Sequence, residues 1–387
     1  MTTETTFTPS TVEEVHAAVA DTRASHPRLL VAGAGTAPDW GAPAEPADAI
    51  IDTTSLSGVL KYAPSDLTIA VRAGTPLTTV QRTLAEAGQR VVLDPARARR
   101  GATIGGLLAT ADAGPLRTAF GSLRDLVIGT TVVLGDGTVA RSGGHVIKNV
   151  AGYDLAKLFH GSLGTLGVVA EVVLRLHPLP PAMCTVAVEA DAGEAFDLAG
   201  RIVMTGLEAS ALEWSGGRLL VRLEGTSEGV EQREGELCRF AGTTARVLTD
   251  EEADAAWAGV AAIADGVQGT TVVRIGTLPA AGPVLVTRMV AAGAAVASSM
   301  AIGVHTVQFT AGDHDELLTQ LHQEFGAAVT VLRRDGLSAG HGWGPPPAPV
   351  RVMRAIKRQF DPAGRFGAGR FGAGRFSPWL EDEERAS

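Results

Sequence analysis

The sequence predicts an α+β protein with more than one domain. Its 387 residues exceed what a single hydrophobic core usually serves. Runs with the period-two pattern of strands alternate with helical patterns, and Gly135-Asp136-Gly137 is typical of a hairpin between antiparallel strands. Pro178-Leu179-Pro180-Pro181 indicates a boundary, because consecutive prolines end a strand and stiffen a linker.

Composition narrows the class of protein further. Hydrophobic residues make up 45% and charged residues 19% of the chain, as in ordinary soluble globular proteins, and the net charge of −9 argues against nucleic acid or an anionic membrane as the main partner. Cys184 and Cys238 lie far apart without a CxxC pattern, so this chain alone is not expected to hold an iron–sulfur cluster. We find no signal peptide and no run of ~20 strongly apolar residues, and we expect a cytoplasmic protein without a transmembrane segment.

The first elements lead into a glycine loop. Ser10 and Glu13 predict a capping box for an amphipathic helix, and residues 29–31 predict a short strand. The strand runs into Gly33-Ala34-Gly35-Thr36, whose successive backbone N–H groups could form an anion-binding nest for a phosphate. A plain turn after a strand is the alternative. The loop is neither a Rossmann fingerprint nor a P-loop, because no third glycine opens a helix and no Gly-Lys-Ser/Thr follows.

The next stretch predicts strands at residues 50–51 and 67–71, a helix from Thr75-Pro76 to Gly88, and a strand at residues 90–93. Three arginines, Arg97, Arg99 and Arg100, follow. They could face phosphates, but an exposed, solvated loop is the interpretation that we prefer from the sequence, and we assign them no role.

Residues 101–178 are the centre of the chain, because they hold fourteen of its 47 glycines between runs rich in Val, Ile and Leu. Glycine allows the backbone to approach a ligand closely and tolerates positive φ. In the last strand of this stretch the period-two pattern from Val168 to Leu176 predicts one buried face. The motifs in order are TIGG (103–106), GSLRD (121–125), VVLGDGT (132–138), KNVAGYDL (148–155) and GSLGTLGVVAEVVLRLHPLP (161–180).

These five motifs in this order resemble the FAD-binding domain of the vanillyl-alcohol-oxidase and p-cresol-methylhydroxylase (PCMH) superfamily, and most of all the accessory flavin subunits of bacterial glycolate oxidases. The resemblance covers residues 29–181 and returns at residues 343–376. It implies a two-part PCMH-type FAD-binding domain in residues 1–180 and a cap domain with an antiparallel sheet covered by helices in residues 181–342. Residues 343–387 would return to the FAD domain.

The resemblance also implies the cofactor site. Covalent attachment in this superfamily uses a His beside the first loop or a Cys elsewhere, and residues 33–40 contain neither, so we expect FAD to be bound non-covalently. The positions that match the family's cofactor loops are Gly33, Ala34, Gly35, Thr36, Thr103, Gly105, Gly106, Thr110, Gly114, Gly121, Asp125, Gly164 and Val168. The plainer interpretation, turn glycines and strand residues, describes the same geometry.

Beyond the prolines the pattern predicts alternating strands and helices, which favours an antiparallel sheet with helices on it. The strands are expected at residues 184–189, 210–214, 218–223, 245–248, 271–275, 304–310 and 328–332, with a helix at residues 351–360 after the sheet. In the tail, Arg-Phe-Gly-Ala-Gly is repeated around Arg365, Arg370 and Arg375. Relatives end with a single GRF segment, and whether Arg370 or Arg375 takes its place is left open.

The catalytic residues stay unknown at this point. Family members that oxidise 2-hydroxy acids carry a His-rich metal site and an SxEHG motif, whereas residues 338–342 here read SAGHG, without the glutamate. His305 and His314 have no metal-ligand spacing, so we expect no metal and read both as histidines with ordinary structural partners. His341, in a glycine-rich loop, is the better functional candidate.

The resemblance therefore implies an oxidoreductase subunit. Its partners would be a second FAD-containing catalytic subunit, an iron–sulfur subunit and a small 2-hydroxy acid, and membrane association would arise only through those partners. Two alternatives remain: a self-sufficient FAD-dependent oxidase or dehydrogenase of a small hydroxylated substrate, and a non-catalytic flavin-fold scaffold.

Overall fold

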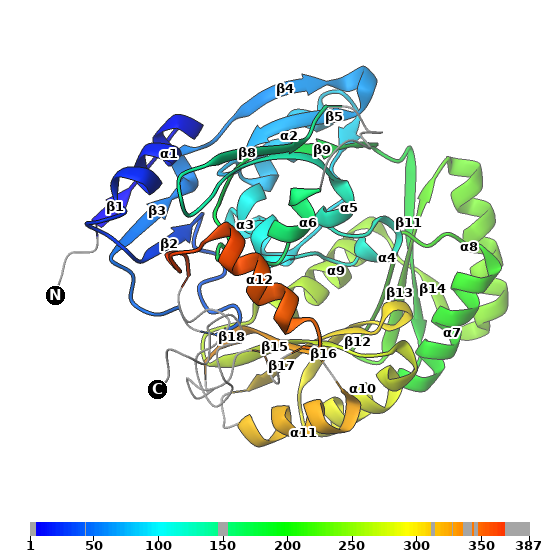
Figure 1. Cartoon of the computed structure of the whole chain (residues 1–387). Coiled ribbons are helices and arrows are strands. Elements are labelled where there is room, and N and C mark those ends of the chain that lie inside the picture. Colours follow the sequence, from blue (N-terminus) through cyan, green and yellow to red (C-terminus); the bar gives the residue numbers. More distant parts are fainter. Residues whose placement is uncertain are drawn as a thin grey trace.

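The computed structural model describes residues 5–42, 44–145, 154–310, 314–326, 328–335, 343 and 347–367. The described elements form an N-terminal region, residues 5–178, and a cap region, residues 182–334, which lie one above the other in Figure 1. A C-terminal segment, residues 347–367, runs between them and ends against the N-terminal region. The α+β class that the sequence predicts is confirmed.

A small parallel sheet begins the N-terminal region. Its strands are ordered β1 (Thr5–Phe7), β3 (Ala49–Asp52) and β2 (Leu29–Ala32), and helix α1 (Val12–Asp21) packs beside it. The predicted capping box is wrong by one residue. Thr11 is the N-cap and accepts a hydrogen bond from the Glu14 N–H, while Ser10 donates its own N–H to the Glu14 carboxylate.

A five-stranded antiparallel sheet forms the larger half of this region. Its order is β4 (Val59–Ala63), β5 (Thr68–Arg72), β9 (Val168–Arg175), β7 (Val127–Val133) and β8 (Val139–Gly143). The hairpin at residues 135–137 is confirmed, because β7 and β8 pair directly across it. Short helices cover the sheet: α2 (Leu77–Ala85), α3 (Ile104–Thr110), α4 (Arg117–Phe120), α5 (Leu123–Leu126) and α6 (Leu155–Phe159).

The strand predicted at residues 90–93 is shorter and shifted. Strand β6 covers only Gln89–Arg90 and pairs with β10 (His177–Pro178). The Leu93 N–H donates to the Val91 carbonyl at 2.8 Å, and this tight turn ends the extended backbone.

The cap region is built on one eight-stranded sheet in which every neighbouring pair is antiparallel. Its order is β14 (Ala245–Val247), β11 (Ala182–Glu189), β13 (Arg218–Gly225), β12 (Ala211–Ser215), β16 (Ala295–Ser299), β17 (Val304–Thr310), β15 (Thr270–Gly276) and β18 (Ala328–Arg334). The predicted antiparallel sheet is confirmed.

Helices cover both faces of the cap sheet. One face buries the main core against α7 (Ala192–Thr205), α8 (Ser227–Ala241), α10 (Gly282–Ala291) and α11 (Asp315–Phe325). The other face packs small side chains against α9 (Asp250–Asp265), which also contacts the 3-10 turn Ala96–Arg100 of the N-terminal region. This second face therefore looks toward the N-terminal region and not toward solvent (Figure 1).

The C-terminal segment completes the small parallel sheet. After α12 (Val350–Phe360), Phe366 forms a parallel bridge with Leu29, whose N–H donates to the Arg365 carbonyl at 2.7 Å. Arg365 is almost fully buried, and its guanidinium donates to the Val19 carbonyl at 2.6 Å and to Thr22 Oγ1 at 3.0 Å. The first Arg-Phe copy is thus docked, while Arg370 and Arg375 lie outside the described residues.

Among the described residues, none of the helices combines the length and the apolar character needed to cross a bilayer.

Candidate functional site

Two neighbouring cavities lie where the glycine loops meet the cap region. The first, which we call the loop pocket, has a volume of about 190 Å³ and is lined by residues 30–38 together with α3 and residues 162–164. The second, the interface cavity, has a volume of about 250 Å³ and lies between the N-terminal region and the second face of the cap sheet. Arg97 belongs to the walls of both.

The loop after β2 presents free backbone donors to the loop pocket. Within the described part of the chain, the N–H groups of Ala34, Gly35 and Thr36 donate to no protein acceptor. Gly35 has φ of +63°, a conformation that brings successive N–H groups to one side of the loop. The predicted anion-binding nest therefore has the donors that a phosphate requires.

The start of α3 gives the loop pocket room for a ligand, but its N–H groups at Gly105 and Gly106 already donate to protein acceptors. Thr103 caps the helix by accepting from the Gly106 N–H at 3.2 Å, and the Gly105 N–H donates to the Ala73 carbonyl at 2.8 Å. A side chain added at Gly106 would meet only Thr103 Oγ1 within 4 Å and would otherwise enter the pocket. Glycine at this position keeps the pocket open.

Ser162 adds a polar group that the sequence motifs did not single out. Its side chain is 6% exposed, lines the loop pocket, and has an Oγ without a hydrogen-bond partner among the described residues. A buried hydroxyl without a hydrogen bond destabilises the fold unless a ligand or a water molecule provides that hydrogen bond. The loop pocket thus combines free amides, a free hydroxyl and glycine walls, which fits the pyrophosphate and ribose of a dinucleotide cofactor.

The structure distributes the predicted cofactor residues over several places. Gly114 lines the interface cavity, while Gly121, Asp125 and Val168 line neither cavity. Asp125 accepts from the Ser122 N–H in the capping box of α5, next to Gly121, and Val168 is fully buried in the core of the small sheet. The loop pocket contains Gly33, Ala34, Gly35, Thr36, Thr103, Gly105, Gly106, Thr110 and Gly164.

Arg97 corrects the interpretation of residues 97–100 as an exposed loop. Its residue is only 4% exposed, and its guanidinium donates to Asp112 at 2.9 Å, to Thr36 at 3.1 Å and to Thr110 at 2.8 Å. Arg99 and Arg100 are both exposed, as expected, although Arg100 also donates to the Thr36 carbonyl at 2.9 Å. The sequence of residues 97–100 is typical of a solvated loop. Arg97 is nevertheless buried, because side chains from distant segments cover it.

Asp112 ties the two regions together beside the interface cavity. One carboxylate oxygen accepts from Arg97 and the other from Arg274 of β15 at 3.0 Å. Both guanidinium groups also lie over the ring of Trp40, at 4.3 and 5.3 Å from its centroid. This cluster fixes the wall that the loop pocket and the interface cavity share.

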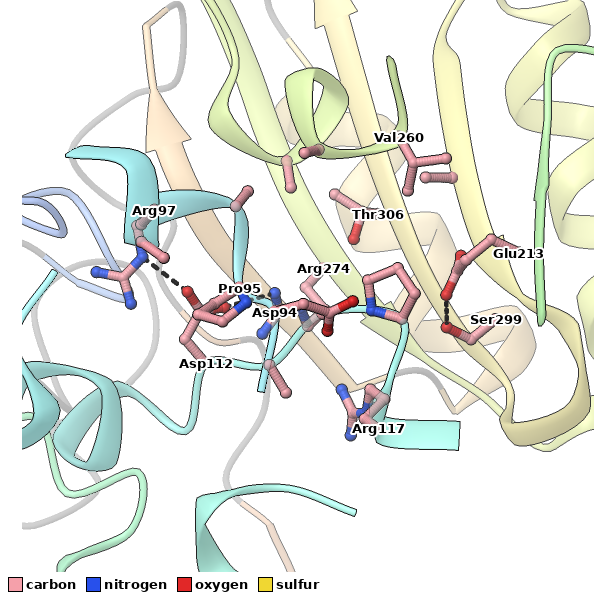
Figure 2. A pocket seen from close by; sticks show the side chains of 18 of the residues that line it. Asp94, Pro95, Arg97, Asp112, Arg117, Glu213, Val260, Arg274, Ser299 and Thr306 are labelled. Carbon is pink, nitrogen blue, oxygen red and sulfur yellow. Dashed lines mark hydrogen bonds and ion pairs between the residues drawn. The ribbon is translucent and has the colours of Figure 1, made fainter. Parts of the chain in front are cut away.

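The cap sheet places a carboxyl group on the opposite wall. Glu213 of β12 is 4% exposed and accepts a hydrogen bond from the Ser299 hydroxyl at the end of β16, as Figure 2 shows. Burial raises the pKa of Glu213 to about 8, and the negative charge of Asp94 adds to this shift. Asp94 itself has its pKa raised to about 6 by burial, against the hydrogen bond from the Leu116 N–H.

Other arginines complete the cavity. Arg222 of β13 lies over the ring of Trp257 at 4.3 Å and places Nη1 3.8 Å from Asp94 Oδ2. Arg117, at the start of α4, points into the cavity from the side of the N-terminal region (Figure 2). The lining therefore combines several guanidinium groups with carboxyl groups that burial makes hard to ionise.

His305 and His314 have structural partners in the cap region. His305 is fully buried between the Ser298 and Thr277 hydroxyls, at 2.7 and 3.0 Å, and burial lowers its pKa to about 4. His314 contacts the Thr310 carbonyl at 2.8 Å. His341 and the rest of residues 338–342 lie outside the described residues. In the described ranges, no three His, Cys, Asp or Glu side chains gather as a metal site requires.

The residues that sequence reasoning missed had weak signals. Glu213 interrupts an otherwise apolar strand, Ala-Leu-Glu-Trp, and lies on the face opposite to Leu212 and Trp214. Its neighbours on that face, such as Ala187 and Ala297, are small and apolar, which is the pattern of a second buried face. Asp94, Arg117 and Arg274 carried no pattern, because only the packing of the two regions brings them together.

Comparison with known proteins agrees with this geometry. Residues 3–143 match the family model of the FAD binding domain. The chain is 35% identical over 228 residues to the glycolate oxidase subunit GlcE of Escherichia coli, covering 59% of this chain and 63% of that protein. It is 37% identical over 174 residues to the D-2-hydroxyglutarate dehydrogenase of Xanthomonas citri pv. viticola, covering 45% of this chain and 36% of that protein.

The chain thus spans less than two thirds of the length of either relative. The fold extends further than the sequence similarity. A solved structure of alkyldihydroxyacetonephosphate synthase superposes with a TM-score of 0.67 over 94% of this chain and 76% of that one, at 15% identity. Taken together, the loop pocket agrees with the match of residues 3–143 to the FAD binding domain, and the chain is similar to a glycolate oxidase subunit and to a D-2-hydroxyglutarate dehydrogenase.

Proposed function

We propose that this chain is the accessory FAD-binding subunit of a glycolate oxidase type complex, which oxidises a small 2-hydroxy acid. The observation that carries the proposal is the wall at Arg97, which the glycine-lined loop pocket and the arginine-lined interface cavity share. Similarity to the Escherichia coli subunit GlcE over 228 residues supports the assignment to that type of complex.

The residues present fit FAD. The free amides of Ala34, Gly35 and Thr36 would hold the pyrophosphate, and Ser162 would complete a hydrogen bond to the cofactor. Gly106 would leave room for the cofactor at α3. When bound, FAD supplies the two-electron chemistry of an alcohol oxidation, and the chain supplies binding, orientation and electrostatics. Gly121, Asp125 and Val168 would act through the packing of the surrounding elements.

Partners would complete the electron route. The two cysteines, Cys184 and Cys238, are both partly buried thiols in the cap region, and burial raises the pKa of each. Two thiols cannot supply the four ligands of an iron–sulfur cluster. A second FAD-containing catalytic subunit and an iron–sulfur subunit would therefore carry the main substrate site and the exit of electrons. Such an assembly would work in the cytoplasm.

One observation favours a second candidate, a self-sufficient FAD-dependent dehydrogenase. The interface cavity is lined by charged side chains that a purely structural subunit would not need. In that case the chain would oxidise its own small hydroxylated acid without partners.

The experiment that separates these functions uses the purified chain. We expect a yellow protein that releases intact FAD on acid or heat denaturation, because no attachment residue is present at the first loop. With glycolate or lactate and a dye, the chain alone should turn over slowly or not at all. Adding a catalytic flavin subunit and an iron–sulfur subunit should restore turnover. Rapid oxidation by the isolated chain, at about 10 turnovers per second or more, would favour the self-sufficient enzyme.

A further inference from the structure

The interface cavity has an excess of positive charge on its walls. Arginines approach it from the 3-10 turn, from α4 and from two strands of the cap sheet, and the carboxyl groups among them are fewer. The charged residues of the lining are Arg97, Arg99, Arg117, Arg222, Arg274, Asp94, Asp112 and Glu213. Both oxygens of Asp112 already accept hydrogen bonds, one from Arg97 and one from Arg274, so Asp112 forms its ion pairs with those two arginines.

Among the buried and partly buried arginines of the lining, Arg117 is the one to which the described residues offer no hydrogen bond or ion pair. Within the described ranges its guanidinium makes no hydrogen bond or ion pair, although the residue is only partly exposed and lines the cavity. Burial lowers the pKa of Arg117, and the positive charge of Arg274 adds to the effect. A desolvated cation without a counter-ion is costly, so the site is prepared for an anion.

Glu213 does not act as that counter-ion near neutral pH. Among the described residues, its carboxyl group accepts one side-chain hydrogen bond, from the Ser299 hydroxyl, and its pKa of about 8 keeps the carboxyl protonated at pH 7. A protonated carboxyl group can donate a hydrogen bond to an anion, which an ionised one cannot. Arg117 and Glu213 are near enough to influence each other's pKa, from opposite walls of the cavity (Figure 2).

We propose that Arg117 and Glu213 form a subsite for the carboxylate group of a small organic acid, with Arg117 supplying the charge and Glu213 the proton of a second hydrogen bond. The assignment deepens the proposed function, on which its link to substrate rests. A cavity of about 250 Å³ lies below the roughly 300–1,000 Å³ typical of drug-sized ligands, which suits an acid of a few carbon atoms.

Binding at this subsite is coupled to protonation. The groups that face Glu213 are Ser299 of β16, Asp94 after β6, Arg117 of α4 and Arg274 of β15. Below pH 8 the neutral Glu213 can donate a hydrogen bond to the carboxylate of the ligand. Above pH 8 the negative charge of Glu213 repels that carboxylate. Affinity should therefore be level from pH 7 to 8 and fall above pH 8, approaching tenfold per pH unit. Asp94, with a pKa of about 6, is already ionised through this window.

The test measures oxalate binding to the FAD-containing chain by isothermal titration calorimetry between pH 7 and 9.5. Arg117→Gln should weaken binding about 10- to 100-fold, as expected for loss of a charged hydrogen bond. Glu213→Gln, which keeps a neutral donor, should bind within a few-fold of wild type at pH 7 and lose the fall above pH 8. Arg141→Gln is the matched control, because Arg141 is an exposed arginine on β8.

Several results would overturn the subsite. These are wild-type affinity in Arg117→Gln, a flat pH profile in the wild-type chain, or sulfate binding as tightly as oxalate at the same residues. Circular dichroism and FAD content check that each variant is folded. If Arg117→Gln is not, Arg117→Lys replaces it, and unchanged affinity there together with a flat wild-type profile would equally reject the proposal.

The same measurements separate this inference from the proposed function. Oxalate binding that depends on Arg117 in a chain without FAD would keep the subsite and reject the flavin role. A yellow, folded chain that binds no oxalate would keep the flavin role and reject the subsite.

Discussion

Arg274 of the cap sheet and Asp112 of the N-terminal region meet across the interface, with Arg274 Nη2 3.0 Å from Asp112 Oδ1. The other oxygen of the same carboxylate accepts from Arg97, which in turn holds Thr36 of the glycine loop. One buried carboxylate therefore fixes both the position of the cap region and the shape of the loop pocket.

Replacing that carboxylate should weaken the whole interface. Asp112→Asn leaves Arg97 buried without its counter-ion, which costs about 3–5 kcal/mol in comparable buried pairs. We expect a matching loss in the free energy of unfolding, measured by urea denaturation, and weaker FAD retention on gel filtration. Glu324→Gln, in the exposed Arg288–Glu324 pair, should cost about 1 kcal/mol or less. Equal losses in the two variants would mean that Asp112 has no special role.

The loop pocket can be tested through Gly106. Gly106→Val should abolish FAD binding while leaving most of the fold, because the added methyl groups enter the pocket and meet only Thr103 nearby. Absorbance at flavin wavelengths and circular dichroism of the purified variant provide the two measurements. Gly200→Val is the control, since Gly200 is an exposed residue of α7 with nothing within 4 Å of an added Cβ. A folded Gly106→Val protein with full flavin content would remove α3 from the site.

Gly105 is a less suitable test than its neighbour. A Cβ at Gly105 would lie 2.8 Å from the Ala73 Cβ and 3.1 Å from the Ala73 carbonyl oxygen. A larger residue there would disturb the packing of the loop after β5, so loss of flavin would not distinguish a blocked pocket from a damaged fold.

The buried carboxyl of Glu213 should make the free energy of unfolding depend on pH. Its carboxyl is protonated in the folded chain up to about pH 8 but ionises near pH 4.5 when unfolded, so the unfolded state loses a proton first. The contribution of this group to stability should therefore be full below pH 4.5 and fall as pH rises toward 8. Relative to wild type, Glu213→Gln should gain up to about 1.4 kcal/mol in unfolding free energy per pH unit across that window. A difference that stays constant from pH 5 to 8 would show that Glu213 is ionised in the fold.

The docked tail gives a further prediction. Arg365→Met should destabilise the chain by about 2–4 kcal/mol, because it leaves the Val19 and Gly135 carbonyls and Thr22 without their donor. Arg351→Gln, an exposed arginine on α12, should change the unfolding midpoint little. Thermal unfolding of the two variants compares them directly, and similar melting temperatures would show that the tail does not hold the small sheet.

Much of the fold could be predicted because the signals are local. Period-two patterning from Val168 to Leu174 and the hairpin at residues 135–137 depend on neighbours in sequence, and both are confirmed. The short strand β6 shows where prediction from local sequence patterns fails. Residues 91–93 look like a strand because they are apolar, but they are buried in a turn that no local pattern marks.

The candidate site divides in the same way. Gly33 to Thr36 and Gly105-Gly106 stand out in sequence because glycine spacing reports on backbone approach. Arg97, Glu213 and Arg274 could not be recognised, since their partners come from segments far away in the sequence. Thr36 is 61 residues from Arg97, Ser299 is 86 from Glu213 and Asp112 is 162 from Arg274. A charged residue looks solvated in sequence until the surface that covers it is known.

The bridge between Leu29 and Phe366 sets an order of events during synthesis. At translation rates of about 5–20 residues per second, Phe366 leaves the ribosome tens of seconds after Leu29. Throughout that time the edge of β2 that will receive it is without its final neighbour, and the cap region emerges in between. The unpaired N–H and C=O groups of such a strand edge can form hydrogen bonds with another chain. The N-terminal region therefore exposes this edge of β2 until Phe366 has been synthesised.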